Sequence, residues 1–150
     1  MSPKRATPTG APQPNPEGPF LPDGTTIFLV DEDDAVRDSL VLSLRAAGHA
    51  VAAFRSARRF LESYRQGDAG CLVVDMDLPD GGAFGLLRTL AVAQVILPAI
   101  ITCRRLRRNT PVGGLPGGRI LFLDKPFGVD ELLRLIRTGM GAGSDSQPGS

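Results

Sequence analysis

Short apolar runs recur along the chain, and their length and β-branched content indicate buried strands. The runs occupy residues 25–30, 50–54, 71–74 and 120–123, with another after Pro98 that reaches Thr102. The run at 50–54 is the weakest of them. Two of the runs stop abruptly at acids, the first at Asp31 and Glu32 and the third at Asp75.

Apolar residues at helical spacing lie between these runs. The clearest stripe is Val36, Leu40 and Leu44, followed by Gly48 as a helix stop, and Ser56 is a candidate N-cap for the next helix. Further helices are predicted around residues 60–64, 84–90 and 129–137. Strands that alternate with helices form βαβ units. The pattern therefore predicts an α/β fold, with a five-stranded parallel sheet covered by helices on both faces.

Composition separates a folded body from two tails. Residues 1–24 are rich in proline, and residues 139–150 are mostly Gly, Ser, Asp and Gln. Neither segment has enough apolar surface to offset the entropy of ordering it. We therefore predict a disordered N-terminal extension at 1–24, one domain at 25–138, a disordered tail at 139–150, and no output domain.

Charge and cysteine content exclude several classes of protein. The net charge of +1 creates no field that would attract nucleic acid or an anionic membrane. Cys71 and Cys103 do not form a disulfide or metal-binding pattern. The chain shows no secretory signal and no apolar run long enough to span a bilayer. These features predict a soluble cytoplasmic protein that binds neither nucleic acid nor membrane directly.

Polar side chains follow the predicted strands where function collects in an open parallel sheet, at the carboxyl ends. They are the acids Asp31, Glu32 and Asp75, the hydroxyl of Thr102 and the ammonium group of Lys125. Two carboxylates about 4 Å apart repel by about 4 kcal/mol at an effective dielectric of about 20. A cluster of acids is therefore stable only when protonated or bridging a cation, and oxygen ligands with water suit Mg²⁺. Asp75 is the candidate nucleophile for phosphoryl transfer, since carboxylates can form aspartyl phosphates.

The sequence resembles the receiver domain of two-component response regulators, most closely the FixJ-like branch. The resemblance covers residues 25–138 and is carried by VDEDDAVRDSL at 30–40, CLVVDMDLP at 71–79 and LDKPF at 123–127. It implies the doubly wound, flavodoxin-like strand order 2-1-3-4-5. It also implies a phosphoacceptor signalling domain rather than an enzyme. The phosphoryl donor would be a sensor histidine kinase or a phosphotransfer protein, and the output would be contact with a downstream protein.

Residue by residue, the resemblance makes Asp75 the phosphoacceptor and Lys125 the cation that contacts its phosphoryl group. Glu32, Asp75 and the backbone carbonyl of Asp77 would bind Mg²⁺ directly, and Asp31 would act through water. It further implies a switch hydroxyl at Thr102, a switch aromatic ring at Phe122 and a cis Lys125–Pro126 bond.

The chain departs from the family pattern between the switch threonine and the lysine. Glycines and prolines interrupt this stretch at Pro111, Gly113, Gly114, Pro116, Gly117 and Gly118. An interior proline costs a helix about 3 kcal/mol and a glycine about 1 kcal/mol relative to alanine. The fourth helix is therefore predicted to be missing, or reduced to a turn at 104–109, which puts the usual dimer face in question. Arg104 is predicted to pair with Asp77.

Two other interpretations use the same residues. A degenerate receiver could act as a phosphorylation-independent scaffold that binds another protein. A phosphatase resembling haloacid dehalogenases also uses an Asp nucleophile and Mg²⁺, and Asp75-Met76-Asp77 imitates its DxD spacing. Its nucleophile normally ends the first strand, however, whereas Asp75 ends the third.

Overall fold

The computed structural model describes residues 21, 24–79, 81–104 and 120–140. The strands in this part of the chain are β1 (Thr26–Val30), β2 (Ala50–Phe54), β3 (Gly70–Asp75), β4 (Ala99–Cys103) and β5 (Ile120–Asp124). The helices are α1 (Asp34–Ala46), α2 (Ala57–Ser63), α3 (Gly82–Val92) and α4 (Val129–Gly139). Strands and helices alternate up to β4, as the hydrophobic pattern predicts.

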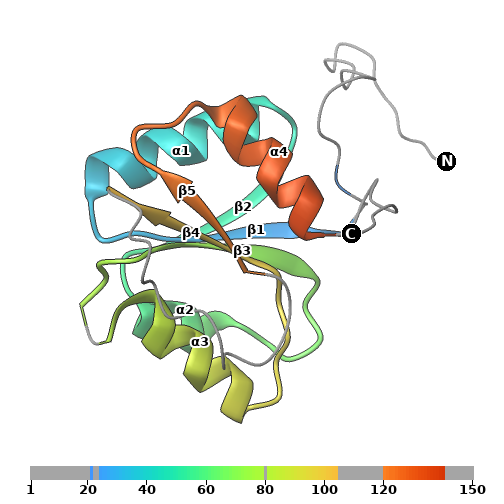
Figure 1. The fold of residues 1–150 in the computed structure, drawn as a ribbon. Coiled ribbons are helices and arrows are strands. Elements are labelled where there is room, and N and C mark those ends of the chain that lie inside the picture. Colours follow the sequence, from blue (N-terminus) through green and yellow to red (C-terminus); the bar gives the residue numbers. More distant parts are fainter. Residues whose placement is uncertain (1–20, 22–23, 80, 105–119, 141–150) are drawn as a thin grey trace, which may run out of the picture.

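The strands form one parallel sheet in the order β2-β1-β3-β4-β5. This is the predicted doubly wound arrangement, and it is confirmed. Helices α1 and α4 cover one face of the sheet, and α2 and α3 cover the other (Figure 1). The chain reverses direction across the sheet between β1 and β3, which are neighbours, so their carboxyl ends form the switch point at which such folds bind ligands.

The core lies in two layers because successive side chains of a strand point to opposite faces of the sheet. In β1, Ile27 and Leu29 pack toward α1 and α4, whereas Phe28 and Val30 pack toward α2 and α3. The strands are apolar on both sides for this reason, as expected for a parallel sheet between helices.

Local signals set the helix ends. The Asp33 carboxylate accepts a hydrogen bond from the amide of Val36 and caps α1, and the Ser56 hydroxyl does the same for α2 through the amide of Arg59. Gly48 has a φ of 96° just after α1, a conformation that glycine adopts without strain. The predictions for Ser56 and Gly48 are confirmed.

Several predictions fall outside the described residues. These include the loss of the fourth helix, which concerns mainly residues 105–119, and the disorder of segments 1–20 and 141–150. Leu21, which belongs to the predicted extension, is buried against the core on the α1 and α4 side. No helix within the described ranges is long and apolar enough to cross a membrane.

Candidate functional site

The sheet register brings the predicted site residues to one edge. Val30 pairs with Val74, so Asp31 and Asp75 follow at the ends of adjacent strands. Asp75 itself pairs with Thr102 on β4. Because Thr102 pairs with Leu123, Lys125 leaves β5 just beyond the same edge.

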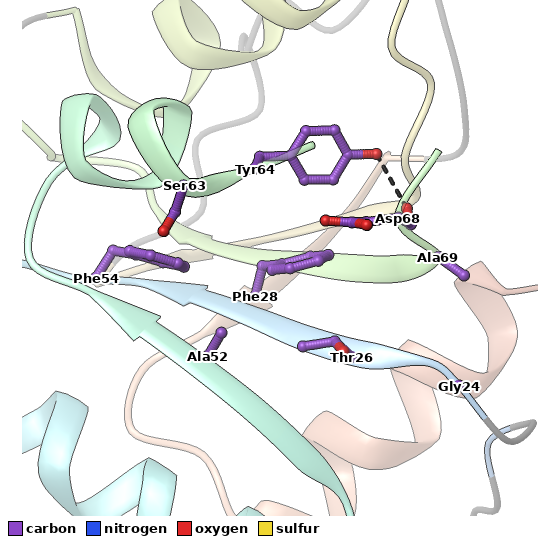
Figure 2. A pocket seen from close by; sticks show the side chains of 9 residues that line it. All are labelled: Gly24, Thr26, Phe28, Ala52, Phe54, Ser63, Tyr64, Asp68 and Ala69. Carbon is purple, nitrogen blue, oxygen red and sulfur yellow. Dashed lines mark hydrogen bonds between the residues drawn. The ribbon is translucent and has the colours of Figure 1, made fainter. Parts of the chain in front are cut away.

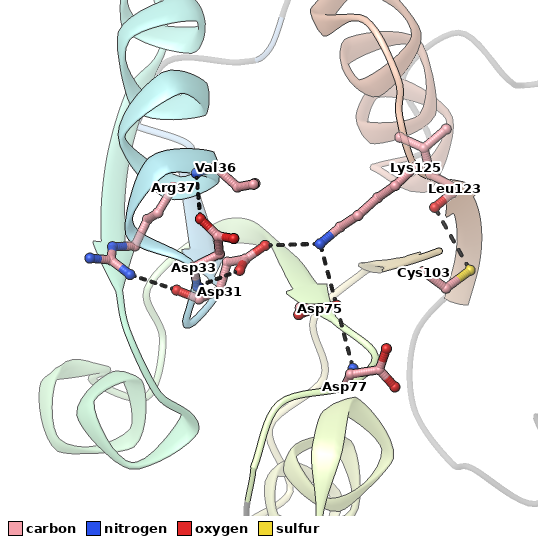
Figure 3. Close-up of polar contacts among 9 residues, drawn as sticks. All are labelled: Asp31, Asp33, Val36, Arg37, Asp75, Asp77, Cys103, Leu123 and Lys125. Atoms are coloured by element: carbon pink, nitrogen blue, oxygen red, sulfur yellow. Dashed lines mark hydrogen bonds and ion pairs between the residues drawn. The ribbon is translucent and has the colours of Figure 1, made fainter. Parts of the chain in front are cut away.

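Lys125 lies between the two carboxylates (Figure 3). Its Nζ atom is 3.3 Å from Oδ2 of Asp31 and 3.5 Å from Oδ1 of Asp75. The side chains of Asp31, Asp75 and Lys125 are only 3%, 12% and 20% exposed, so solvent screens these pairs much less than it screens surface pairs. One cation thus offsets the repulsion between two carboxylates, as the physics of the cluster requires.

Asp31 is held at several points around its backbone and side chain. Its amide donates a hydrogen bond to the carbonyl of Phe54, and its carbonyl accepts one from the Arg37 guanidinium at 2.7 Å. Its Oδ1 atom accepts the amide of Asp33 at 2.9 Å, which leaves Oδ2 facing Lys125. The sequence did not predict this role of Arg37. The only sequence feature that could have indicated it is an arginine one turn into the helix that follows the acids.

Asp75 is in an environment that disfavours its charged form. Burial raises the pKa of the Asp75 carboxyl, and the nearby carboxylates of Asp31 and Asp77 act in the same direction. The Lys125 ammonium group and the amide of Asp77, which donates to Oδ1 at 3.4 Å, oppose the rise in pKa. A bound cation would favour the ionised, nucleophilic form of this carboxyl.

Thr102 pairs with Asp75 on the neighbouring strand β4, and Phe122 lies on β5, three residues before Lys125. Thr102 is 2% exposed, and its hydroxyl makes no hydrogen bond to any residue that the structure describes. A buried hydroxyl without a partner is costly, so an incoming acceptor would be stabilised there. Phe122 is half-buried and lies against Phe84 of α3, with ring centroids 6.4 Å apart. The Lys125–Pro126 bond is cis, as predicted.

Other predicted residues stay outside these contacts. Glu32 is exposed and makes no hydrogen bond or ion pair within the described ranges, so the structure does not bring it into the cluster. Its role stays a prediction. Arg104 is also exposed, and it forms no ion pair with Asp77 among the described residues, so that prediction is wrong for this structure.

The donor set fits Mg²⁺ better than an ion that needs a complete protein cage. No group of three or more His, Cys, Asp or Glu side chains in the described part of the chain is arranged as a metal site. The strand ends instead supply the carboxylates of Asp31 and Asp75, which lie 3.3 Å and 3.5 Å from the same Lys125 Nζ atom. The carbonyl of Asp77, two residues beyond Asp75 in the sequence, is the third candidate oxygen donor. Mg²⁺ is commonly bound through one or two carboxylates and keeps several waters.

Both cysteines are buried and free. Burial raises the pKa of the Cys71 thiol to about 12. The pKa of the Cys103 thiol rises to about 11, first through burial and then through its hydrogen bond to the Asp124 carboxylate. The backbone of Cys103 also links the ends of β4 and β5 beside the site, because its carbonyl accepts a hydrogen bond from the Lys125 amide at 2.7 Å.

We expect neither thiol to react readily with a disulfide reagent such as DTNB while the protein is folded. At pH 8 a thiol with a pKa of about 11 is ionised in about one molecule in a thousand, and the thiolate is the reactive form. Absorbance should report slow labelling in buffer and rapid labelling of both thiols in concentrated urea. Rapid labelling of the native protein would contradict the burial of these cysteines, and Cys103→Ser would show which thiol is exposed.

A cavity of about 330 Å³ lies elsewhere, on the α2 side of β1 and β2. The rings of Phe28, Phe54 and Tyr64 line it together with the Asp68 carboxylate (Figure 2). None of its lining residues belongs to the carboxylate cluster. The chemistry of charged groups therefore points to the strand ends rather than to this cavity.

The chain is similar to known regulators in sequence. Residues 27–137 match the family described as "Response regulator receiver domain". The transcriptional regulatory protein FixJ of Azorhizobium caulinodans is 29% identical over 125 residues, which is 83% of this chain and 59% of that protein. Response regulator protein TmoT of Ectopseudomonas mendocina is 33% identical over 116 residues, covering 77% and 53%. The chain thus spans little more than half the length of these curated relatives.

Solved structures show the same relationship. The response regulator StyR superimposes with a TM-score of 0.72 at 34% identity, over 81% of this chain and 62% of that one. The structure of FixJ-N gives a TM-score of 0.63 at 28% identity, over 84% and 98%. The chain therefore belongs to the response regulator receiver domain family, whose members are signalling domains rather than enzymes.

Proposed function

We propose that the chain accepts a phosphoryl group on Asp75 in a Mg²⁺-dependent reaction and thereby changes its contacts with a partner protein. The donor is a sensor histidine kinase or a phosphotransfer protein, and the reaction takes place in the cytoplasm. The observation that carries the proposal is the position of Asp75, whose carboxylate ends β3 beside Asp31 and within 3.5 Å of Lys125 Nζ. Membership of the receiver family supports it.

The transfer step needs little covalent chemistry from the protein. A carboxylate oxygen of Asp75 forms a bond to phosphorus while the bond from phosphorus to the donor atom breaks. The donor's electron pair leaves with its imidazole nitrogen, or with acetate when acetyl phosphate is the donor. The product is an aspartyl phosphate.

The surrounding residues would position the phosphoryl group and balance its charge. Asp75 and the carbonyl of Asp77 would hold Mg²⁺ directly, Asp31 would hold it through water, and Glu32 would have to turn inward from its exposed position to complete the set. A bound ion would supply positive charge to balance that of the phosphoryl oxygens. Lys125 already lies against Asp75, and its ammonium group is a point charge suited to a phosphate oxygen. It would exchange a carboxylate oxygen for a phosphoryl oxygen with little movement.

Thr102 and Phe122 would carry the change to the surface. The Thr102 hydroxyl is buried beside Asp75 in the sheet and lacks a partner within the described residues, so a phosphoryl oxygen would be a favourable acceptor. Phe122 is half-buried next to Phe84 and would move into space released by the threonine. A local change in charge would in this way bias a two-state element.

Incubation with acetyl phosphate tests this function. With Mg²⁺ present, intact mass should show one phosphoryl adduct, and amide NMR signals of Asp75, Thr102 and Phe122 should shift. Chelation of Mg²⁺ with EDTA should abolish both effects. Absence of any adduct and of any Mg²⁺-dependent shift would contradict the proposal and favour a scaffold. Steady release of phosphate from phosphate esters would instead favour a phosphatase.

A further inference from the structure

The carbonyl oxygen of Asp31 lies just beyond the end of β1, where the ladder of the sheet stops. Within the described residues it accepts one hydrogen bond, from the guanidinium of Arg37 at 2.7 Å. A buried carbonyl without a partner is costly, and a donor that carries charge makes a stronger bond than a neutral one. Arg37 therefore holds the backbone at the point where the chain turns from the strand into α1.

The same turn orients the Asp31 carboxylate. Its Oδ1 atom accepts the amide of Asp33 at 2.9 Å, and its Oδ2 atom lies 3.3 Å from Lys125 Nζ (Figure 3). The direction of Oδ2 thus depends on the backbone between Asp31 and Asp33. Arg37 contacts the Asp31 carbonyl on the side of that residue away from Lys125 (Figure 3), and the Arg37 side chain is only 15% exposed.

Arg37 also forms an ion pair within α1, which could serve only to stabilise that helix. Another of its nitrogens pairs with the Asp34 carboxylate, which is 67% exposed. Exposed pairs on a helix contribute little to stability. The buried contact with the Asp31 carbonyl is the one with consequences for the site.

We propose that Arg37 is a positioning residue of the phosphorylation site, holding the Asp31 carbonyl so that the Asp31 carboxylate faces Lys125 and Asp75. The consequence for Mg²⁺ rests on the proposed function: Arg37 tunes the affinity for the ion through Asp31, without contacting the ion itself.

The first test needs neither metal nor phosphate. Amide hydrogen exchange in the full chain should be at least about tenfold faster at Asp33 in Arg37→Ala than in the wild type, because the Asp31 carboxylate no longer holds that amide. The amide of Leu29, inside β1, should be unchanged, which excludes global unfolding. Asp34→Ala removes the exposed pair and keeps the carbonyl contact, so it should leave Asp33 at the wild-type rate. Equal exchange at Asp33 in Arg37→Ala and wild type would overturn the proposal.

The second test follows amide shifts during titration with MgCl₂. Arg37→Ala should raise the dissociation constant about tenfold, and Arg58→Ala, a matched change at an arginine that is 82% exposed, should not. In the Asp31→Asn background, Arg37→Ala should add less than about twofold, because it acts through Asp31. An equal effect in both backgrounds would overturn the proposed route. Absence of Mg²⁺ binding by the wild type would count against the proposed function, while the exchange at Asp33 still decides the role of Arg37.

Discussion

Asp75→Asn is expected to form no phosphoryl adduct under conditions that fully label the wild type with acetyl phosphate and Mg²⁺. The amide has nearly the same shape as the carboxylate, so the packing at the end of β3 is retained. It carries no negative charge and is a poor nucleophile toward phosphorus, so the bond to phosphorus cannot form. Intact mass spectrometry measures the result directly.

The matched control for this variant is Asp68→Asn. Asp68 is exposed in the loop before β3, so it lies at the opposite end of that strand from Asp75. It lines the cavity described above rather than the strand-end cluster. The Asp68→Asn variant carries the same chemical change at a position with no proposed role, so acetyl phosphate should label it like the wild type. An adduct of undiminished amount in Asp75→Asn would contradict the assignment of the phosphoacceptor.

Asp75→Asn should be as stable toward unfolding as the wild type. Burial raises the folded-state pKa of the Asp75 carboxyl, so its ionised form is less favourable in the folded protein than in the unfolded chain. The Asp75 carboxyl therefore contributes most to the stability of the folded protein at low pH, where it is protonated. This contribution is lost as the pH rises through the folded-state pKa. Because Asn has no such charge, thermal unfolding at neutral pH should show Asp75→Asn at least as stable as the wild type. Loss of the adduct cannot then be attributed to unfolding.

Phe60→Ala is expected to lower the free energy of unfolding by about 3–5 kcal/mol. Phe60 is 0% exposed, and its ring centroid lies 5.5 Å from that of Phe28, 5.6 Å from that of Phe54 and 5.4 Å from that of Tyr64. Truncation removes the edge-to-face contacts with Phe28 and Phe54 and the tilted contact with Tyr64, and it leaves a cavity under the short helix α2. Because domains are typically stable by about 5–15 kcal/mol, the loss is a large fraction of the total.

Urea unfolding followed by circular dichroism measures this change. Leu61→Ala is the control, because Leu61 is the next residue of α2 and is 37% exposed. Its loss should be under about 1 kcal/mol, as for surface positions generally. Phe60→Leu keeps much of the side-chain volume and should lie between the two. A loss of under about 1 kcal/mol in Phe60→Ala would show that the aromatic cluster does not hold α2 on the sheet.

The hydrophobic pattern by itself determined the α/β class and the parallel sheet between helices. Apolar runs that end in acids identified β1 and β3, because a strand buried on both faces has no place for a charge until it leaves the sheet. Parallel strands place their carboxyl ends at one edge, so the sequence alone groups Asp31 and Asp75 with Lys125. The motif spacing then identified the family, and the strand order followed from it.

The directions of individual side chains were decided only by the tertiary structure. Asp31 and Glu32 are neighbours in sequence, yet the turn after β1 buries one and leaves the other exposed. The position of Lys125 between two carboxylates depends on how the backbone leaves β5. Arg37 lies six residues from Asp31, and only the path of the chain into α1 brings its guanidinium to that carbonyl. Sequence spacing predicts which residues reach an edge of the sheet, whereas hydrogen bonds of the turns decide which atoms face each other.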